Sequence, residues 1–151
     1  MQHRFEITDK HRNVIGKAFD RREQQVTREC LLEYADLMGA THPIYLDPEV
    51  ARARGYRDII AMPTFLIAEA SLPLVPPEIP FAGGGLNAGY DCAFYGDVYP
   101  GDTLTYSTCI VDLYDKTGRS GTMYFVIRET TVSNQHLETV ALIRNPFILR
   151  W

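Results

Sequence analysis

A histidine and a tyrosine flank a proline at His42, Pro43 and Tyr45, and this pair has the spacing in the chain best suited to acid–base chemistry. Because the two residues lie three positions apart around a turn, both side chains could face one pocket. An imidazole moves a proton near neutral pH, whereas a free phenol has a pKa of about 10 and is a poor base there. We favour the structural interpretation, in which His42 hydrogen-bonds the backbone of the Pro43 turn and Tyr45 packs on a helix. No catalytic assignment is firmer than this pair.

Metal and thiol chemistry finds less support in the sequence. The three cysteines, Cys30, Cys92 and Cys109, are widely spaced, and the four histidines show no H-x-x-x-H spacing. Metal sites are usually built from ligands at such short spacings. An odd number of dispersed cysteines is typical of reduced thiols in a cytoplasmic protein. We therefore expect a cytoplasmic protein that holds no metal and no cofactor.

The composition predicts one domain over residues 1–151. The chain has 151 residues, of which 46% are hydrophobic, and a formal net charge of −4. That length suits a single domain with a packed core. Nucleic-acid binding requires clustered positive charge, so no such partner is expected. No apolar run approaches the roughly 20 residues of a membrane span, and the N-terminus lacks the apolar region of a signal peptide.

Three helices are expected in the first half of the chain. Residues 27–38 place apolar side chains at helical spacing after a capping threonine. A second, short helix begins at Asp47 and Pro48, with the aspartate as its N-cap. The third helix covers residues 63–72 and is apolar almost all round, which predicts that it is buried.

The second half changes to the period of two that is typical of strands. Strands are expected over residues 86–95, 102–114, 122–132 and 137–149, with turns at 116–120 and 133–136, and residues 14–25 are a further strand or a loop. Three long antiparallel strands around one very apolar helix predict an α+β fold. Before them, residues 73–85 carry four prolines and end in Gly83-Gly84-Gly85, which predicts a loop. The glycines either let backbone approach a ligand or form a plain hinge.

Two segments resemble the MaoC-like dehydratase family. Residues 34–69 read YADLMGATHPIYLDPEVARARGYRDIIAMPTFLIAE, and residues 98–104 read VYPGDTL. The family pattern is A-x-x-x-G-D-x-N-P-I-H-x-D, a helix ending in glycine, I-A-H-G, and later R-P-V-x-x-G-D-x-L. Its scaffold positions are present as Gly39, Pro43, Ile44, Asp47, Ala51, Gly55, Ile60 and Ala61. The resemblance covers about residues 26–149 and implies a hotdog fold, an antiparallel sheet wrapped around a long central apolar helix.

The same resemblance fails at each position that does chemistry. In the family, an aspartate and a histidine activate water, which adds to an enoyl thioester, and a backbone N–H stabilises the enolate oxygen. Here the family's aspartate, asparagine and histidine fall on Ala40, His42 and Tyr45. Its I-A-H-G is I-A-M-P, ending in a proline that has no N–H to donate. The degenerate family positions are Ala40, His42, Tyr45, Met62 and Pro63.

A sequence that keeps the scaffold but loses these residues resembles the non-catalytic half of double-hotdog hydratases. It also resembles the non-catalytic subunit of heterodimeric dehydratases. The resemblance therefore implies an accessory subunit of an (R)-specific enoyl-CoA hydratase or 3-hydroxyacyl thioester dehydratase. It would bind an acyl-CoA or acyl-carrier-protein thioester beside a catalytic MaoC-like partner, in a heterodimer or heterotetramer. Without that partner we expect a homodimer, formed through the strand over residues 86–95, because bare sheet edges are normally paired.

Two alternatives stay open from the sequence. The chain could be an autonomous hydratase or thioesterase with rewired acid–base residues, or a non-enzymatic module that binds acyl thioesters. In each case the acyl-pocket candidates are Met62, Thr64, Phe65, Gly83, Gly84, Gly85 and Leu86.

Overall fold

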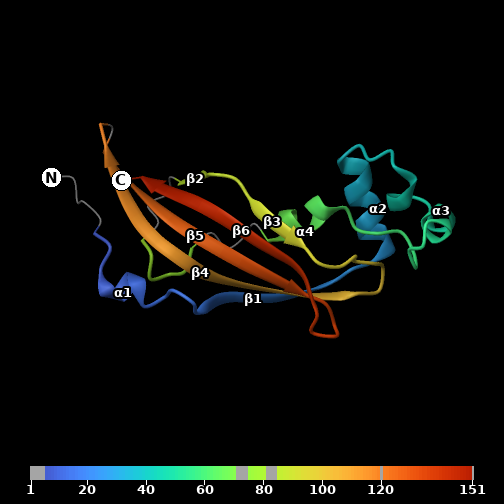
Figure 1. The fold of residues 1–151 in the computed structure, drawn as a ribbon, viewed down its shortest axis with the longest axis horizontal. Coiled ribbons are helices and arrows are strands. Elements are labelled where there is room, and N and C mark those ends of the chain that lie inside the picture. Colours follow the sequence, from blue (N-terminus) through green and yellow to red (C-terminus); the bar gives the residue numbers. More distant parts are fainter. Residues whose placement is uncertain (1–5, 71–74, 81–84, 120, 151) are drawn as a thin grey trace.

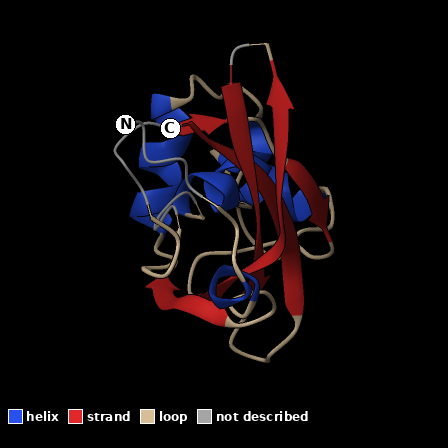
Figure 2. Cartoon of the chain, turned by 90° about the vertical axis from the view of Figure 1, so that its left-hand side faces the viewer, coloured by secondary structure: helices blue, strands red, loops and turns tan. Residues whose placement is uncertain are grey.

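A computed structural model describes residues 6–70, 75–80, 85–119 and 121–150 of the chain. It contains a six-stranded antiparallel sheet with the order β1-β4-β5-β6-β2, and β3 pairs with β6 as well. The strands are β1 (Ala18–Gln25), β2 (Gly85–Asn87), β3 (Asp91–Phe94), β4 (Thr103–Gly118), β5 (Gly121–Ser133) and β6 (Thr139–Arg150). The long strands β4, β5 and β6 run side by side along the molecule (Figure 1), and Figure 2 shows that the sheet curls.

The helices gather near the two ends of this sheet (Figure 1). They are α1 (Asp9–Arg12), α2 (Arg28–Leu37), the 3₁₀ helix η1 (Pro43–Tyr45), α3 (Pro48–Ala53) and α4 (Pro63–Glu69). The expected caps are confirmed: Thr27 Oγ1 accepts from the Cys30 N–H at 3.1 Å, and Asp47 Oδ1 accepts from the Glu49 N–H at 2.8 Å. No helix in the described ranges is long and apolar enough to cross a membrane.

Helix α4 is shorter than expected. It ends at Glu69, with Ala70 as its C-cap, so the described helix does not extend to residue 72. Prolines follow closely in the sequence, and proline cannot continue a helix because it lacks the N–H and its ring clashes with the preceding turn. Phe65 and Leu66 are buried, but Thr64 is exposed, so this helix buries one face and not its whole surface.

Two strand predictions also need correction. The strand expected over residues 86–95 is divided into β2 and β3, because Gly89 adopts a φ of 110° and its N–H donates to Asn87 Oδ1 at 2.9 Å. The turn expected over residues 116–120 is largely strand, since β4 runs to Gly118 and pairs there with Gly121. The Tyr114 and Phe125 rings stack across these strands with 4.9 Å between their centres. This contact supports strand pairing beyond the residues whose apolar and polar side chains alternate. Residues 14–25 form a strand only from Ala18 onward.

The core has two parts along the inner face of the sheet. The helical-end core consists of Val26, Leu31, Ile59, Phe65, Leu66, Ala70, Val98, Leu104, Tyr106, Val132, Val140, Ala141 and Ile143. The far-end core consists of Val14, Ile79, Ile110, Leu113, Tyr124, Val126, Phe147 and Leu149.

Buried polar residues of the sheet stand at the junction of these cores. The hydroxyls of Thr108 and Thr130 are hydrogen-bonded at 2.8 Å, and Arg128 Nε donates to Asn145 Oδ1 at 3.1 Å. All four residues are buried, and burial lowers the pKa of the Arg128 guanidinium.

Candidate functional site

The segment between α3 and α4 carries the degenerate I-A-M-P sequence, and backbone hydrogen bonds fix it on two sides. The Ile60 N–H donates to the Ile44 carbonyl in η1 at 3.3 Å, and the Ala61 N–H donates to the Val98 carbonyl before β4 at 2.8 Å. These bonds bring the distant parts of the family pattern together. They also engage the N–H groups of Ile60 and Ala61.

A buried carboxylate holds the start of the same segment. Asp102, which is 4% exposed, accepts a hydrogen bond and ion pair from Arg57. It also accepts from the Tyr99 N–H at 2.8 Å and from Gln135 Nε2 at 3.1 Å. The Arg57 guanidinium stacks 4.2 Å from the centre of the Tyr99 ring. Asp102 therefore joins Arg57 to β4 and to the β5–β6 turn.

Asp58, the residue after Arg57, forms a second attachment of this segment. Its Oδ2 accepts from Arg28 of α2 at 2.6 Å and from Arg52 of α3 at 3.4 Å, and its Oδ1 accepts from the Ile59 N–H at 2.7 Å. The hydrogen bond from Arg28 is the main cause that lowers the pKa of the Asp58 carboxyl below its ordinary value, while burial works against it. The segment is thus tied to helices on one side and to the sheet on the other.

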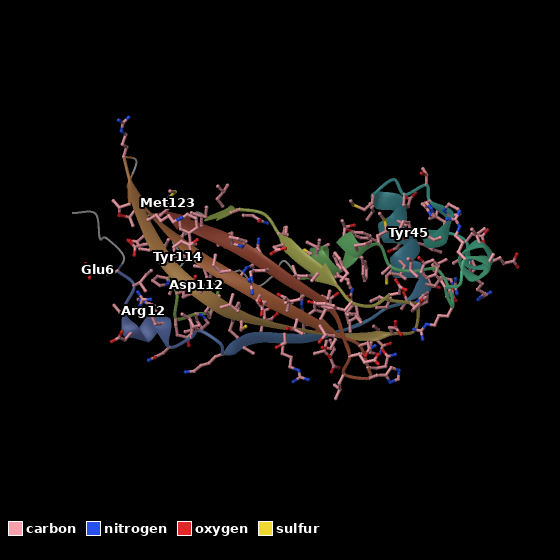
Figure 3. All side chains as sticks on the ribbon, in the orientation of Figure 1. Glu6, Arg12, Tyr45, Asp112, Tyr114 and Met123 are labelled. Atoms are coloured by element: carbon pink, nitrogen blue, oxygen red, sulfur yellow. The ribbon has the colours of Figure 1, made fainter. Side chains whose placement is uncertain are left out.

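A small cavity of about 90 Å³ lies beside this segment. Its lining includes Tyr45, Ile60, Ala61, Pro63, Leu66, Phe94, Gly96, Asp97 and Val98. Two of the degenerate family positions, Tyr45 and Pro63, therefore meet where the sequence pattern places them. Figure 3 shows Tyr45 among the helices, far from Tyr114 and Met123 at the other end of the sheet.

The lining of this cavity is mostly apolar. Tyr45 and Asp97 carry the polar side chains among its described lining residues, and the Asp97 carboxylate lies 3.5 Å from the Tyr99 hydroxyl, at the limit of a hydrogen bond. A wall of this kind can hold an acyl group by excluding water from it. A larger polar cleft of about 500 Å³ adjoins the cavity, shares Gly96 and Asp97 with it, and contains His136.

The other degenerate positions lie outside the cavity and have structural contacts. The Ala40 N–H donates to the Ala35 carbonyl at 2.8 Å after the end of α2. Met62 is the N-cap of α4, and its carbonyl accepts from the Phe65 N–H at 2.9 Å. His42 caps η1, because its Nδ1 accepts from the Ile44 N–H at 3.3 Å, which is the backbone contact expected of it.

The acyl-pocket candidates are not gathered around the cavity. Phe65 is buried in the helical-end core, with its ring edge-on to that of Tyr34 at 5.4 Å, while Thr64 is exposed. Gly85 and Leu86 are exposed in β2, and Gly83 and Gly84 lie outside the described residues. Met62 does not line the cavity either, so none of the described candidates belongs to the cavity lining.

Sequence reasoning missed Phe94, Gly96 and Asp97, which form the sheet side of the cavity. A signal for them was present. Gly96 and Asp97 immediately precede Val98 of the V-x-x-G-D stretch, where the family pattern has R-P. Because β3 brings these residues back beside Pro63, their departure from the pattern changes the cavity wall.

Comparison with known sequences identifies a family. A family model described as the FAS1-like dehydratase domain region matches residues 13–143. A UPF0336 protein of Thermobifida fusca is 32% identical over 114 residues, which cover 72% of this chain and 75% of that protein. A shorter match, 40% identical over 57 residues, spans only 38% of the length of a UPF0336 protein of Streptomyces avermitilis.

Comparison with solved structures identifies the fold. A MaoC-like dehydratase from Rhodospirillum rubrum has a TM-score of 0.72 at 23% identity, covering 89% of this chain and 91% of that chain. For Mycobacterium tuberculosis, the HadBC 3R-hydroxyacyl-ACP dehydratase complex gives 0.73 at 21% identity, with 89% and 96% covered. The ChsH1-ChsH2 complex of the same organism gives 0.74 at 19% identity, with 88% of each chain covered. The expectation of a hotdog fold like that of MaoC-like dehydratases is confirmed.

Proposed function

The chain belongs to the FAS1-like dehydratase family, and on this premise we propose that it is the accessory, acyl-thioester-binding subunit of an (R)-specific enoyl-CoA hydratase or 3-hydroxyacyl thioester dehydratase. A catalytic hotdog partner would supply the aspartate, the histidine and the oxyanion donor. The observation that carries the proposal is the cavity, where the scaffold is assembled but Tyr45 and Pro63 occupy chemical positions. The third such position, Ala40, has no group that could accept a proton.

The backbone around the cavity supports a non-catalytic role. A transition state with an enolate oxygen needs a free N–H aimed at that oxygen. Pro63 has no N–H, and those of Ile60 and Ala61 already donate to Ile44 and Val98. An isolated chain would therefore lack both the proton-transfer pair and these donors.

The exposed edge of the sheet supports a partner. Leu86, Tyr90, Phe94 and Tyr95 are exposed along β2, β3 and the residues that follow them. Strand edges with apolar side chains are normally paired in the assembled protein. Phe94 also lines the cavity, so a hotdog partner on this edge would stand next to the acyl site. The ChsH1-ChsH2 and HadBC complexes among the structural neighbours support the presence of a partner chain.

The test is a hydration assay with crotonyl-CoA and longer enoyl-CoA substrates, on the chain alone and co-purified with a catalytic MaoC-like chain. The partner chain is identified by an intact G-D-x-N-P-x-H motif in its sequence, and the neighbouring gene is the first place to search for it. We expect no measurable turnover by the isolated chain. The co-purified pair should turn over the substrates, including those with longer acyl chains. A turnover of about 1 per second or more by the chain alone would overturn the proposal.

Edge variants sharpen this test. Leu86→Glu with Phe94→Glu places charge on the exposed edge and should abolish co-purification and the gain in turnover, because burying an unpaired charge is costly. Leu137→Glu is the matched control, since Leu137 is 84% exposed in the β5–β6 turn and belongs to neither β2 nor β3. If the edge variant still assembles while the control behaves the same, the partner binds elsewhere.

A second candidate, an autonomous enzyme, rests on one observation. Tyr45 and Asp97 both line the cavity, so a phenol and a carboxylate could form a replacement acid–base pair. Any turnover by the chain alone should then be lost in both Tyr45→Phe and Asp97→Asn. Under the accessory role, these variants leave the turnover of the assembled pair within a few-fold.

A further inference from the structure

The ring of His42 has a defined hydrogen-bonding direction. Its Nδ1 accepts from the Ile44 N–H at 3.3 Å, which caps η1. Only an unprotonated ring nitrogen can accept a hydrogen bond. In the neutral ring the proton must then be on Nε2, which acts as a donor.

That Nε2 faces a second donor. Nη1 of Arg54 lies 3.5 Å from it, and a guanidinium has donors only. Two N–H donors thus lie side by side, and neither can accept from the other, whereas one oxygen atom at hydrogen-bond distance from both would satisfy the two. Within the described part of the chain, the hydrogen-bonding contact of the Arg54 side chain is with His42 Nε2, and that of His42 Nε2 is with Arg54.

The neighbouring arginines are engaged differently. Arg28 and Arg52 both donate to the Asp58 carboxylate, and Arg57 is paired with Asp102. Each of these three cations therefore faces an anion from the chain, whereas Arg54 faces an imidazole. The exposed position of Arg54 and His42 leaves room for an anion from outside.

The location links this donor pair to the cavity. The His42 ring lies edge-on to the Tyr45 ring, with 6.0 Å between their centres, and Tyr45 lines the cavity. The pair is therefore at the helical rim of the acyl site, where the carrier end of a bound thioester could pass into solvent.

We propose that His42 Nε2–H and Arg54 form a binding site for the phosphate of the phosphopantetheine arm of an acyl thioester. The identity of this ligand rests on the proposed function, but the two-donor geometry does not. A guanidinium is well suited to phosphate oxygens, and charge-assisted bonds of this type are about twice as strong as neutral ones. The arm is shared by coenzyme A and by carrier proteins, so the site is expected to recognise either source.

The test uses the full chain labelled with ¹⁵N-histidine and long-range ¹H–¹⁵N NMR. Without ligand, we expect the neutral His42 ring to carry its proton on Nε2. Addition of inorganic phosphate, 4′-phosphopantetheine or coenzyme A should shift the Nε2 signal along a saturable curve, and pantetheine without phosphate should not. Similar affinity for 4′-phosphopantetheine and coenzyme A assigns the site to the arm, whereas much tighter binding of coenzyme A assigns it to the nucleotide phosphates.

Variants make the assignment specific. Arg54→Gln should weaken binding of 4′-phosphopantetheine about tenfold, as expected for loss of one charge-assisted hydrogen bond. Arg21→Gln, at an exposed position of β1, is the matched control and should bind as the wild type does. A proton on Nδ1, equal binding of pantetheine, or unchanged binding by Arg54→Gln would each overturn the site. The proposed function fails separately, in the paired hydration assay, even if phosphate binding is observed.

Discussion

The two ends of the sheet are covered by different kinds of structure. At the helical end, α2 and α4 place Leu31, Phe65 and Leu66 on the strands. At the far end, the described residues 75–80 lie outside any helix and place Ile79 on the strands, together with Val14 from the N-terminal region. The helical end also carries Asp58 and Asp102, whose carboxylates fasten the segment that leads to α4.

This difference indicates what each end does. The far end only needs to shield apolar strand residues, so turns that bury a few apolar side chains are sufficient. The helical end holds the segment between α3 and α4, which forms few hydrogen bonds of the kind that join strands. The position of this segment relative to η1 and β4 defines the cavity. Polar fastening is therefore concentrated where position matters, although the chemical groups of the family are missing there.

The largest expected effect is at the far end. Ile79 is 2% exposed, and Ile79→Ala should lower the free energy of unfolding by about 3 kcal/mol, because it removes buried methylenes and leaves a cavity. Urea denaturation followed by circular dichroism measures this change. The neighbouring Glu78→Ala, at an exposed position, is the control and should change stability by less than about 0.5 kcal/mol. If Ile79→Ala is equally mild, the segment is not a structural cover.

A smaller loss is expected when the fastening at the helical end is broken. Asp102→Ala leaves the Tyr99 N–H and Gln135 without their acceptor and should cost about 2 kcal/mol. The contribution of Arg57 is modest because its side chain is 58% exposed, where solvent weakens ion pairs. Asp115→Ala, an exposed carboxylate of β4, is the control in the same urea experiment. Equal stability of the two variants would show that Asp102 does not fasten the loop.

The sequence predicted those features whose signals are local. Thr27 and Asp47 cap helices through bonds to residues two or three positions ahead, and such spacings are visible in a single sequence. The motif placed Tyr45 and Pro63 at one site, and both line the cavity. The fold followed from the family resemblance and the strand pattern together.

Features that depend on distant partners were not predictable in this way. The extension of β4 through residues 116–118 depends on β5, which pairs across the hairpin. Phe94 and Asp97 line the cavity only because β3 pairs with β6 and returns the chain to Pro63. The two fastening carboxylates face arginines up to 45 positions away in sequence, and no local pattern marks such pairs.

The smallest effect is expected at the second attachment, and its signature is its dependence on pH. The hydrogen bond from Arg28 lowers the pKa of Asp58 in the folded chain below its ordinary value of about 3.9. The folded state then binds fewer protons than the unfolded state in that range, so the contribution of Asp58 is complete above about pH 5 and is lost as the pH falls through the folded pKa. Asp58→Asn should lower stability at pH 7 by less than Asp102→Ala does, and its difference from the wild type should shrink between about pH 4 and pH 3. Urea denaturation at pH 7, 5, 4 and 3 measures this difference, with Asp115→Asn, at an exposed position of β4, as the control. A difference for Asp58→Asn that persists unchanged to pH 3 would mean that Arg28 does not stabilise the charged carboxylate, and the helical end would then be fastened through Asp102 alone.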